Sequence, residues 1–284
     1  MSVKIIVDSA ADFLSEAAAA KGLIVLPMKT RIDGVEYLDG VDVSHIEFYE
    51  KLLQARKMPS TSQLTLYDFE QAFQSATADG DEAVVITIAA KLSGTVQNAL
   101  VAAQSFPERV WVVDSDSASI GERVLVEYAV RLRDADWSAA AIAAELEQAK
   151  QRVRMVGLLD TLEYLIRGGR LTGVSALAGS LLRVKSILGL HAGTIEVLEK
   201  TRSFRQGVGI MNLNIEKQGG VDAEMPVILG FSGVDDTLMQ KYLAASHSLW
   251  QEQGVPPVVT IGSAIGSHVG PGMVAAAFFI PADQ

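Results

Sequence analysis

The chain has 284 residues, of which 49% are hydrophobic and 20% are charged, so it carries enough apolar material for one or two packed cores and is not a disordered chain. It has 24 Lys and Arg residues and 34 Asp and Glu residues, and the resulting net charge of −10 argues against nucleic-acid binding. The absence of Cys excludes disulfides, thiolate metal sites and thiol nucleophiles. The N-terminal apolar run stops at Asp8, and the run 273–280 is too short to span a bilayer, so we expect a cytoplasmic protein without an integral membrane segment.

The first half of the chain alternates short apolar runs with helical patterns. Near-continuous apolar runs of this length are typical of strands buried in a parallel sheet, and they occur at Val3–Val7, Leu23–Leu26, Glu82–Ile88 and Arg109–Val113. Between them, Ser44 with Glu47 and Thr65 with Asp68 predict helix starts of the capping-box type, and 138–150 predicts a further helix. This alternation predicts an α/β domain whose ligands bind beyond the carboxyl ends of the strands.

The second half is less regular and favours a sheet with antiparallel pairs covered by helices. A strand at Met155–Leu159 precedes a short helix from Thr161 to about Arg167 and a turn at 168–170. A helix is expected at Ser175–Val184, and then a hairpin, in which strands Ile187–Leu190 and Thr194–Leu198 flank 191–193. Further helices are expected at Arg205–Lys217 and Thr237–Gln253, and further strands at Val227–Phe231, Val258–Ile261 and Val274–Ile280.

Glycine is distributed unevenly along the chain. Residues 1–142 hold 6 of the 24 glycines and residues 143–284 hold 18, which indicates that the two halves differ in architecture. We therefore predict two domains: an N-terminal α/β domain with a mainly parallel sheet at 1–150, and a C-terminal α+β domain with a mixed or antiparallel sheet at 151–284. The last strands and the loop 268–272 are expected to pack back on the first domain.

Three segments rich in hydroxyl groups lie in predicted loops. They are Pro59–Gln63, Lys91–Thr95 at the entry to a helix that ends near Ala103, and Asp114–Ser119. Hydroxyls and free N–H groups at a helix N-terminus bind phosphate or carboxylate, although Ser and Thr are also common as ordinary helix caps. Asp114 and Asp116 have too few neighbouring ligands to indicate a metal site.

The stretch Ile261–Gly272 holds four glycines and a proline and predicts a loop whose backbone turns tightly or approaches a ligand. His268 in its middle is the histidine best placed to contact a ligand. The motifs of phosphate-binding loops, dinucleotide-binding turns, zinc proteases and serine hydrolase elbows are missing. A hydrolase that uses Ser93 or Ser115 as nucleophile and His268 as base stays open as an alternative, although the sequence singles out no acid that would orient the histidine.

In combination, these segments resemble the DegV family of fatty-acid-binding proteins nearly end to end. The matching residues keep the family's order: Val7-Asp8-Ser9 with Asp12, Pro27-Met28, Thr61-Ser62-Gln63, Leu92–Ala99, Val113-Asp114-Ser115 with Ala118-Ser119, Leu162–Leu171, Gly179–Lys185 and His268–Gly272. Their order and spacing together are specific, although no single segment is.

The resemblance implies a non-enzymatic carrier that buries one long-chain fatty acid, such as palmitate, stearate or oleate, in an apolar tunnel and needs no cofactor or metal. It implies that Thr61, Ser62, Ser93, Gly94 and Thr95 in the hydroxyl segments hold the carboxylate. It also implies that His268 lies near the carboxylate. Some family members present the acid to a separate fatty acid kinase, and Arg202 matches an arginine that matters for that docking. An ester or thioester hydrolase and a purely regulatory interaction module are the alternatives.

Overall fold

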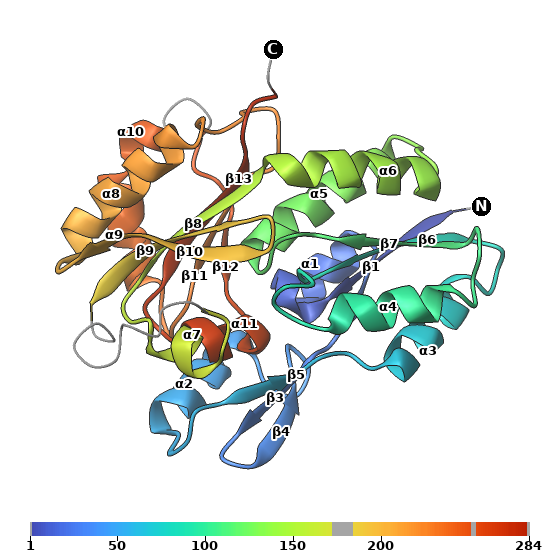
Figure 1. Ribbon diagram of the computed structural model, residues 1–284, viewed down its shortest axis with the longest axis horizontal. Coiled ribbons are helices and arrows are strands. Elements are labelled where there is room, and N and C mark those ends of the chain that lie inside the picture. Colours follow the sequence, from blue (N-terminus) through green and yellow to red (C-terminus); the bar gives the residue numbers. More distant parts are fainter. Residues whose placement is uncertain (1, 172–183, 251–253, 283–284) are drawn as a thin grey trace.

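The computed structural model describes residues 2–171, 184–250 and 254–282, and its strands form three sheets (Figure 1). The first sheet is parallel, with strand order β2-β1-β6-β7. Its strands are β1 (Val3–Asp8), β2 (Leu23–Leu26), β6 (Glu82–Thr87) and β7 (Val110–Asp114). All four coincide with apolar runs of the sequence, since strands covered on both faces need no polar alternation.

Helices cover both faces of the parallel sheet. Helices α3 (Leu66–Ala76) and α4 (Thr95–Ala103) pack on one face, and α5 (Ile120–Asp134) and α6 (Ala139–Ala149) pack on the other; α1 (Ser15–Ala20) lies against β2. The capping boxes predicted at Ser44 and Thr65 are both present, at the starts of α2 (His45–Gln54) and α3. Helix α5 also contacts β8, β11 and β13, so it lies between the parallel sheet and the next sheet.

The second sheet is mixed, with strand order β10-β9-β8-β13-β11-β12. Its strands are β8 (Val153–Leu159), β9 (Lys185–His191), β10 (Thr194–Thr201), β11 (Ile228–Phe231), β12 (Val258–Thr260) and β13 (Val274–Phe279). Only β11 and β12 pair in parallel; the other neighbours are antiparallel. Helix α8 (Phe204–Lys217) and helix α9 (Thr237–Ala245) pack on this sheet. The predicted fold class and the predicted hairpin at 191–193 are therefore confirmed.

The predicted helix Thr237–Gln253 is divided in the structure. Helix α9 ends at Ala245 and α10 (His247–Trp250) follows, because Ser246 leaves helical geometry and exchanges hydrogen bonds with the Asn212 side chain. Residues 251–253 and most of the helix predicted at Ser175–Val184 lie outside the described residues. Each of the two larger sheets uses strands from one half of the chain, and the domain boundary near residue 150 stays a prediction.

A third sheet was not predicted. It is antiparallel, with order β4-β3-β5, and its strands are β3 (Lys29–Ile32), β4 (Val35–Leu38) and β5 (Ser60–Ser62). Asp33 and Gly34 join β3 to β4 and both have positive φ, and Asp-Gly is a strong signal for such a two-residue hairpin turn. The hydroxyl segment around Thr61, predicted to be a loop, is thus an edge strand held by β3.

Candidate functional site

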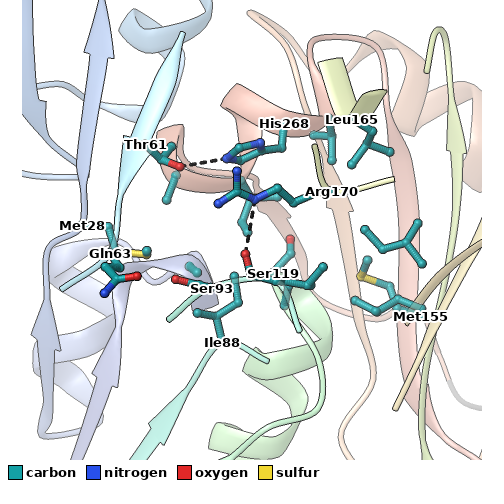
Figure 2. Close-up of a pocket in the computed structure, with 18 of the residues that line it drawn as sticks. Met28, Thr61, Gln63, Ile88, Ser93, Ser119, Met155, Leu165, Arg170 and His268 are labelled. Atoms are coloured by element: carbon teal, nitrogen blue, oxygen red, sulfur yellow. Dashed lines mark hydrogen bonds between the residues drawn. The ribbon is translucent and has the colours of Figure 1, made fainter. Parts of the chain in front are cut away.

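A cavity of about 350 Å³ opens among the three sheets, within the size range of about 300–1,000 Å³ that small-molecule sites occupy. Its walls come from segments far apart in the sequence: β5, the turns after β6 and β7, strands β8 to β10, the end of α7 (Glu163–Arg167) and helix α11 (Ser263–Val269). The polar residues among its walls are Thr61, Ser62, Gln63, Ser93, Ser119, Arg170 and His268. Figure 2 shows most of them gathered on one side, with Met155 and Leu165 on the other.

A hydrogen bond joins two of the predicted ligand-binding residues in the wall of this cavity. Thr61 Oγ1 on β5 lies 2.8 Å from His268 Nε2 on α11 (Figure 2). Burial, with a smaller contribution from the Arg170 charge, lowers the pKa of His268 to about 4. The imidazole is therefore neutral at neutral pH and acts as a hydrogen-bonding group, not as a cation.

Arg170 provides a positive charge in the wall, and its guanidinium is anchored on the main chain. Nη1 donates to Gly168 O at 2.7 Å and Nε to Leu92 O at 3.3 Å. The second bond ties the segment after α7 to the turn that carries Ser93. A guanidinium is a strong partner for a carboxylate, because it offers several N–H groups in one plane.

Ser93 lines the cavity in the turn before α4, but its two neighbours in the motif do not. The Thr95 side chain is fully buried, with its Oγ1 2.9 Å from Ser93 Oγ, so it supports Ser93 from behind. Gly94 is the N-cap residue just before α4 and lies beside the Gln63 side chain, which occupies the space that a Cβ would need. The motif thus brings one hydroxyl to the cavity and uses the other two residues to position it.

The other end of the cavity is apolar. It is walled by Met155, Leu165, Leu190 and Ile195, and these residues also border an adjoining space of about 40 Å³ next to β8 and β9. The polar and apolar ends together accommodate a molecule with an anionic or polar head and an aliphatic tail.

The prediction that Ile261–Gly272 forms a loop is wrong around His268, because residues 263–269 form helix α11; the tightly turning backbone is confined to the residues that follow, where Gly270 and Gly272 have positive φ. Two remote carboxylates accept hydrogen bonds from the first amides of this helix: Asp12 from Gly262 N at 2.7 Å and Asp39 from Ser263 N at 2.8 Å. Gly266 lets the helix approach α2, since a Cβ there would lie 2.6 Å from both the Phe48 ring and the Tyr49 hydroxyl. These contacts hold His268 on the last turn of α11, next to the cavity.

The structure brings Thr61, Ser62, Ser93 and His268 together, and it adds three polar side chains that were not among the predicted site residues, namely Gln63, Ser119 and Arg170. Arg170 belongs to the motif Leu162–Leu171, and Ser119 belongs to the third hydroxyl segment. These two segments were the signals in the sequence from which both residues could have been proposed as site residues. Arg202 is exposed just after β10, roughly 20 Å along the strand from Ile195. Its role in docking stays a prediction.

The geometry gives no support to the alternative of a serine hydrolase. His268 Nε2 bonds Thr61, and Nδ1 has no hydrogen-bond partner among the described residues, so no acid orients the imidazole there. Ser115 is fully buried, donates to Ser117 O and does not line the cavity. Across the described parts of the chain, no group of three or more acidic or His side chains could hold a metal ion. No helix in those same parts is long and apolar enough to cross a bilayer.

Comparison with known proteins agrees with this architecture. The family model for DegV, described as an uncharacterised protein of the DegV family, matches residues 2–281. A DegV domain-containing protein of Caldanaerobacter subterraneus subsp. tengcongensis is 32% identical over 271 residues, covering 95% of each chain. The structure of a DegV family protein from Thermus thermophilus, described by its fatty acid binding, is 30% identical with a TM-score of 0.86 and covers 99% of this chain and all of that one.

A stearic-acid-binding protein of Eubacterium ventriosum shares the fold, with a TM-score of 0.83 at 22% identity and 98% coverage of both chains. The family match spans nearly all of the sequence, and it includes every segment that lines the cavity. The chain therefore belongs to the DegV family.

Proposed function

We propose that this protein binds one long-chain fatty acid, with the carboxylate at the polar end of the cavity and the acyl chain at the apolar end. The observation that carries the proposal is the division of a single cavity into these two ends. Ser93 and Arg170 supply donors for the head group, and the hydrogen-bonded pair of Thr61 and neutral His268 supplies one more, because one of the pair's two protons is used between them. The described fatty acid binding of the Thermus thermophilus relative supports the same ligand class.

The apolar end supplies most of the attraction. Burial is worth about 0.8 kcal/mol per CH₂, hence roughly 11 kcal/mol for a chain with about 14 methylenes. Association costs about 4–15 kcal/mol, and a hydrogen bond to a charged group contributes about 1.5–3 kcal/mol. The head-group contacts therefore orient the ligand and keep its charge solvated by protein, while the chain decides whether it binds at all.

We further propose that the protein is a carrier that presents the acid to a separate fatty acid kinase. The sequence has no phosphate-binding loop of its own, which supports a role as substrate carrier over one as kinase. Arg202, exposed at the end of β10, is the proposed docking residue. Such a surface charge acts mainly on the rate of association.

Extraction of the purified protein with organic solvent, followed by mass spectrometry, tests the binding. We expect one fatty acid per chain, and restoration of that ratio when delipidated protein is given palmitate or oleate. A lipid-free extract combined with no uptake of either acid would contradict the proposal. An assay with ester and thioester substrates, in which we expect no turnover, tests the hydrolase alternative in the same preparation.

A further inference from the structure

Ser119, in the wall of the cavity, has an unusual backbone and an unusual partner. Its φ of 57° and ψ of −138° lie in a region that favours glycine, and its side-chain hydroxyl donates to Asp12 Oδ2 at 2.5 Å. Asp12 itself has a φ of 57°. Two such non-glycine residues in contact beside a ligand cavity indicate a conformation that the surrounding structure maintains, and such conformations cluster at functional sites.

Asp12 is fully buried, and its two carboxylate oxygens have different partners. Oδ1 accepts a hydrogen bond from Gly262 N at 2.7 Å, and Oδ2 accepts the one from Ser119. An amide N–H can only donate, so a proton taken up by Asp12 must reside on Oδ2 and face Ser119.

The surroundings of Asp12 are rich in acid. The charged and titratable groups around it are Asp8 on β1, Asp39 after β4, His45 and Tyr49 on α2, and Glu122 and Arg123 on α5; His268 and Arg170 line the same cavity as Ser119. Arg123 donates a hydrogen bond to the Asp12 main-chain oxygen at 2.7 Å, and its positive charge acts to lower the pKa of the Asp12 carboxyl. Burial, with a smaller contribution from Asp39, raises the pKa of Asp12 to about 8; burial raises that of Asp8 to about 7.

Ser119 has a single hydroxyl proton, and this limits what it can do. When Asp12 is ionised, the proton is directed to Oδ2 and away from the cavity. When Asp12 takes up a proton from solvent, its new O–H group donates to Ser119 Oγ, and the Ser119 hydroxyl is free to turn and donate to an acceptor in the cavity. A bound carboxylate is such an acceptor, and its negative charge also disfavours an ionised Asp12 nearby.

We propose that Asp12 is the proton-accepting partner of Ser119, so that binding of a carboxylate in the cavity is coupled to the uptake of one proton by Asp12. This inference rests on the proposed function, because it requires the ligand head group to reach Ser119. Asp12 is a positioning residue here, since it acts on the ligand through the Ser119 hydroxyl.

Calorimetric titration with dodecanoate, kept below the concentration at which it aggregates, tests the coupling. Paired buffers with different ionisation enthalpies report the protons taken up per ligand bound. With Asp12 titrating near pH 8 in the free protein, uptake should rise from about 0.1 proton at pH 7 to about 0.9 at pH 9, and affinity should fall by up to about tenfold per pH unit above pH 8.

Three variants separate Asp12 from the other acids. In Asp12→Asn the amide mimics the protonated carboxyl, with its oxygen toward Gly262 and its NH₂ toward Ser119, so the pH dependence should disappear while binding persists. Ser119→Gly suits the positive φ and removes the hydroxyl; it should bind about tenfold or more weakly, without proton uptake. Asp81→Asn is the matched control, since Asp81 bonds Ser2 and Lys4 before β6, away from the cavity, and should keep the parent's proton uptake.

Three outcomes would overturn the proposed coupling between ligand binding and proton uptake. Parent protein that binds dodecanoate with no proton uptake at pH 9 refutes it and leaves the proposed function intact. Unchanged uptake in Asp12→Asn assigns the proton to another group. Parent protein that binds neither dodecanoate nor palmitate at any pH overturns the inference and the proposed function together.

Discussion

Replacement of Thr61 by Val removes one hydroxyl from the polar end of the cavity and keeps the shape of the side chain. Two contributions follow from the geometry. The ligand carboxylate loses a donor, and His268 Nε2 loses the partner that lies 2.8 Å away, while Nδ1 already has none among the described residues. A buried polar group that lacks a hydrogen-bond partner costs about 1–3 kcal/mol, which corresponds to a loss of affinity of about 5- to 150-fold.

The fold of the Thr61→Val variant should be intact. Thr61 pairs with Thr30 through main-chain contacts of the β3–β5 ladder, and Val is favoured in strands. Thermal unfolding checks this, and calorimetric titration with oleate measures the affinity. Thr61→Ser, which keeps the hydroxyl, should bind within a few-fold of the parent. Thr237→Val, on an exposed residue that does not line the cavity, is the matched control.

If Thr61→Val binds oleate as tightly as the parent does, the carboxylate lies elsewhere and the assignment of the polar end is incorrect. If Thr61→Ser is as weak as Thr61→Val, the loss comes from packing and not from the hydroxyl. Either result would refute the reasoning from hydrogen bonds.

Four further predictions concern charge, chain length, pH and docking. Arg170→Gln should weaken oleate binding by about tenfold or more, because the carboxylate loses a charged partner; an unchanged dissociation constant would contradict this. Ile195→Trp should fill the apolar end, so that stearate loses more affinity than decanoate in direct titration, and equal losses would count against this location of the chain. The raised pKa of Asp12 lets the folded state hold a proton that the unfolded state has already released. The free energy of unfolding, measured in urea, should therefore fall by roughly 2 kcal/mol from about pH 6.5 to pH 8, and by less in Asp12→Asn. A rise in the free energy of unfolding over this pH range would contradict the prediction. Arg202→Ala should leave oleate affinity nearly unchanged and slow phosphorylation of the bound acid by a partner kinase, most clearly at low salt, whereas a joint loss of both would make Arg202 a structural or ligand residue.

Local patterns were sufficient for the elements whose causes are local. The apolar runs at β1, β6 and β7 predicted buried strands because such strands need no polar face. The helix starts at Ser44 and Thr65 were predictable because a capping box satisfies its own amides within four residues. The turn at 192–193 was predictable for a similar reason, since it joins strands that are adjacent in the chain.

The same patterns were insufficient where the partner is remote. Helix α11 looks like a glycine-rich loop because the carboxylates that accept its first N–H bonds, Asp12 and Asp39, lie more than 200 residues away in the sequence. Strand β5 is short and polar, and it exists because β3 offers it an edge. Neither partner can be deduced from the segment itself.

For the candidate site, the sequence by itself determined which segments carry hydroxyls and an unusual histidine, and the family resemblance connected them with a fatty acid. Only the tertiary structure decided which side chains share a cavity. It added Arg170 and Ser119, and it turned Thr95 into a support for Ser93. The physical reason is that a side chain's type follows from the sequence, but its direction and burial follow from packing among β5, α11 and the turns after β6 and β7, which meet only when the sheets come together.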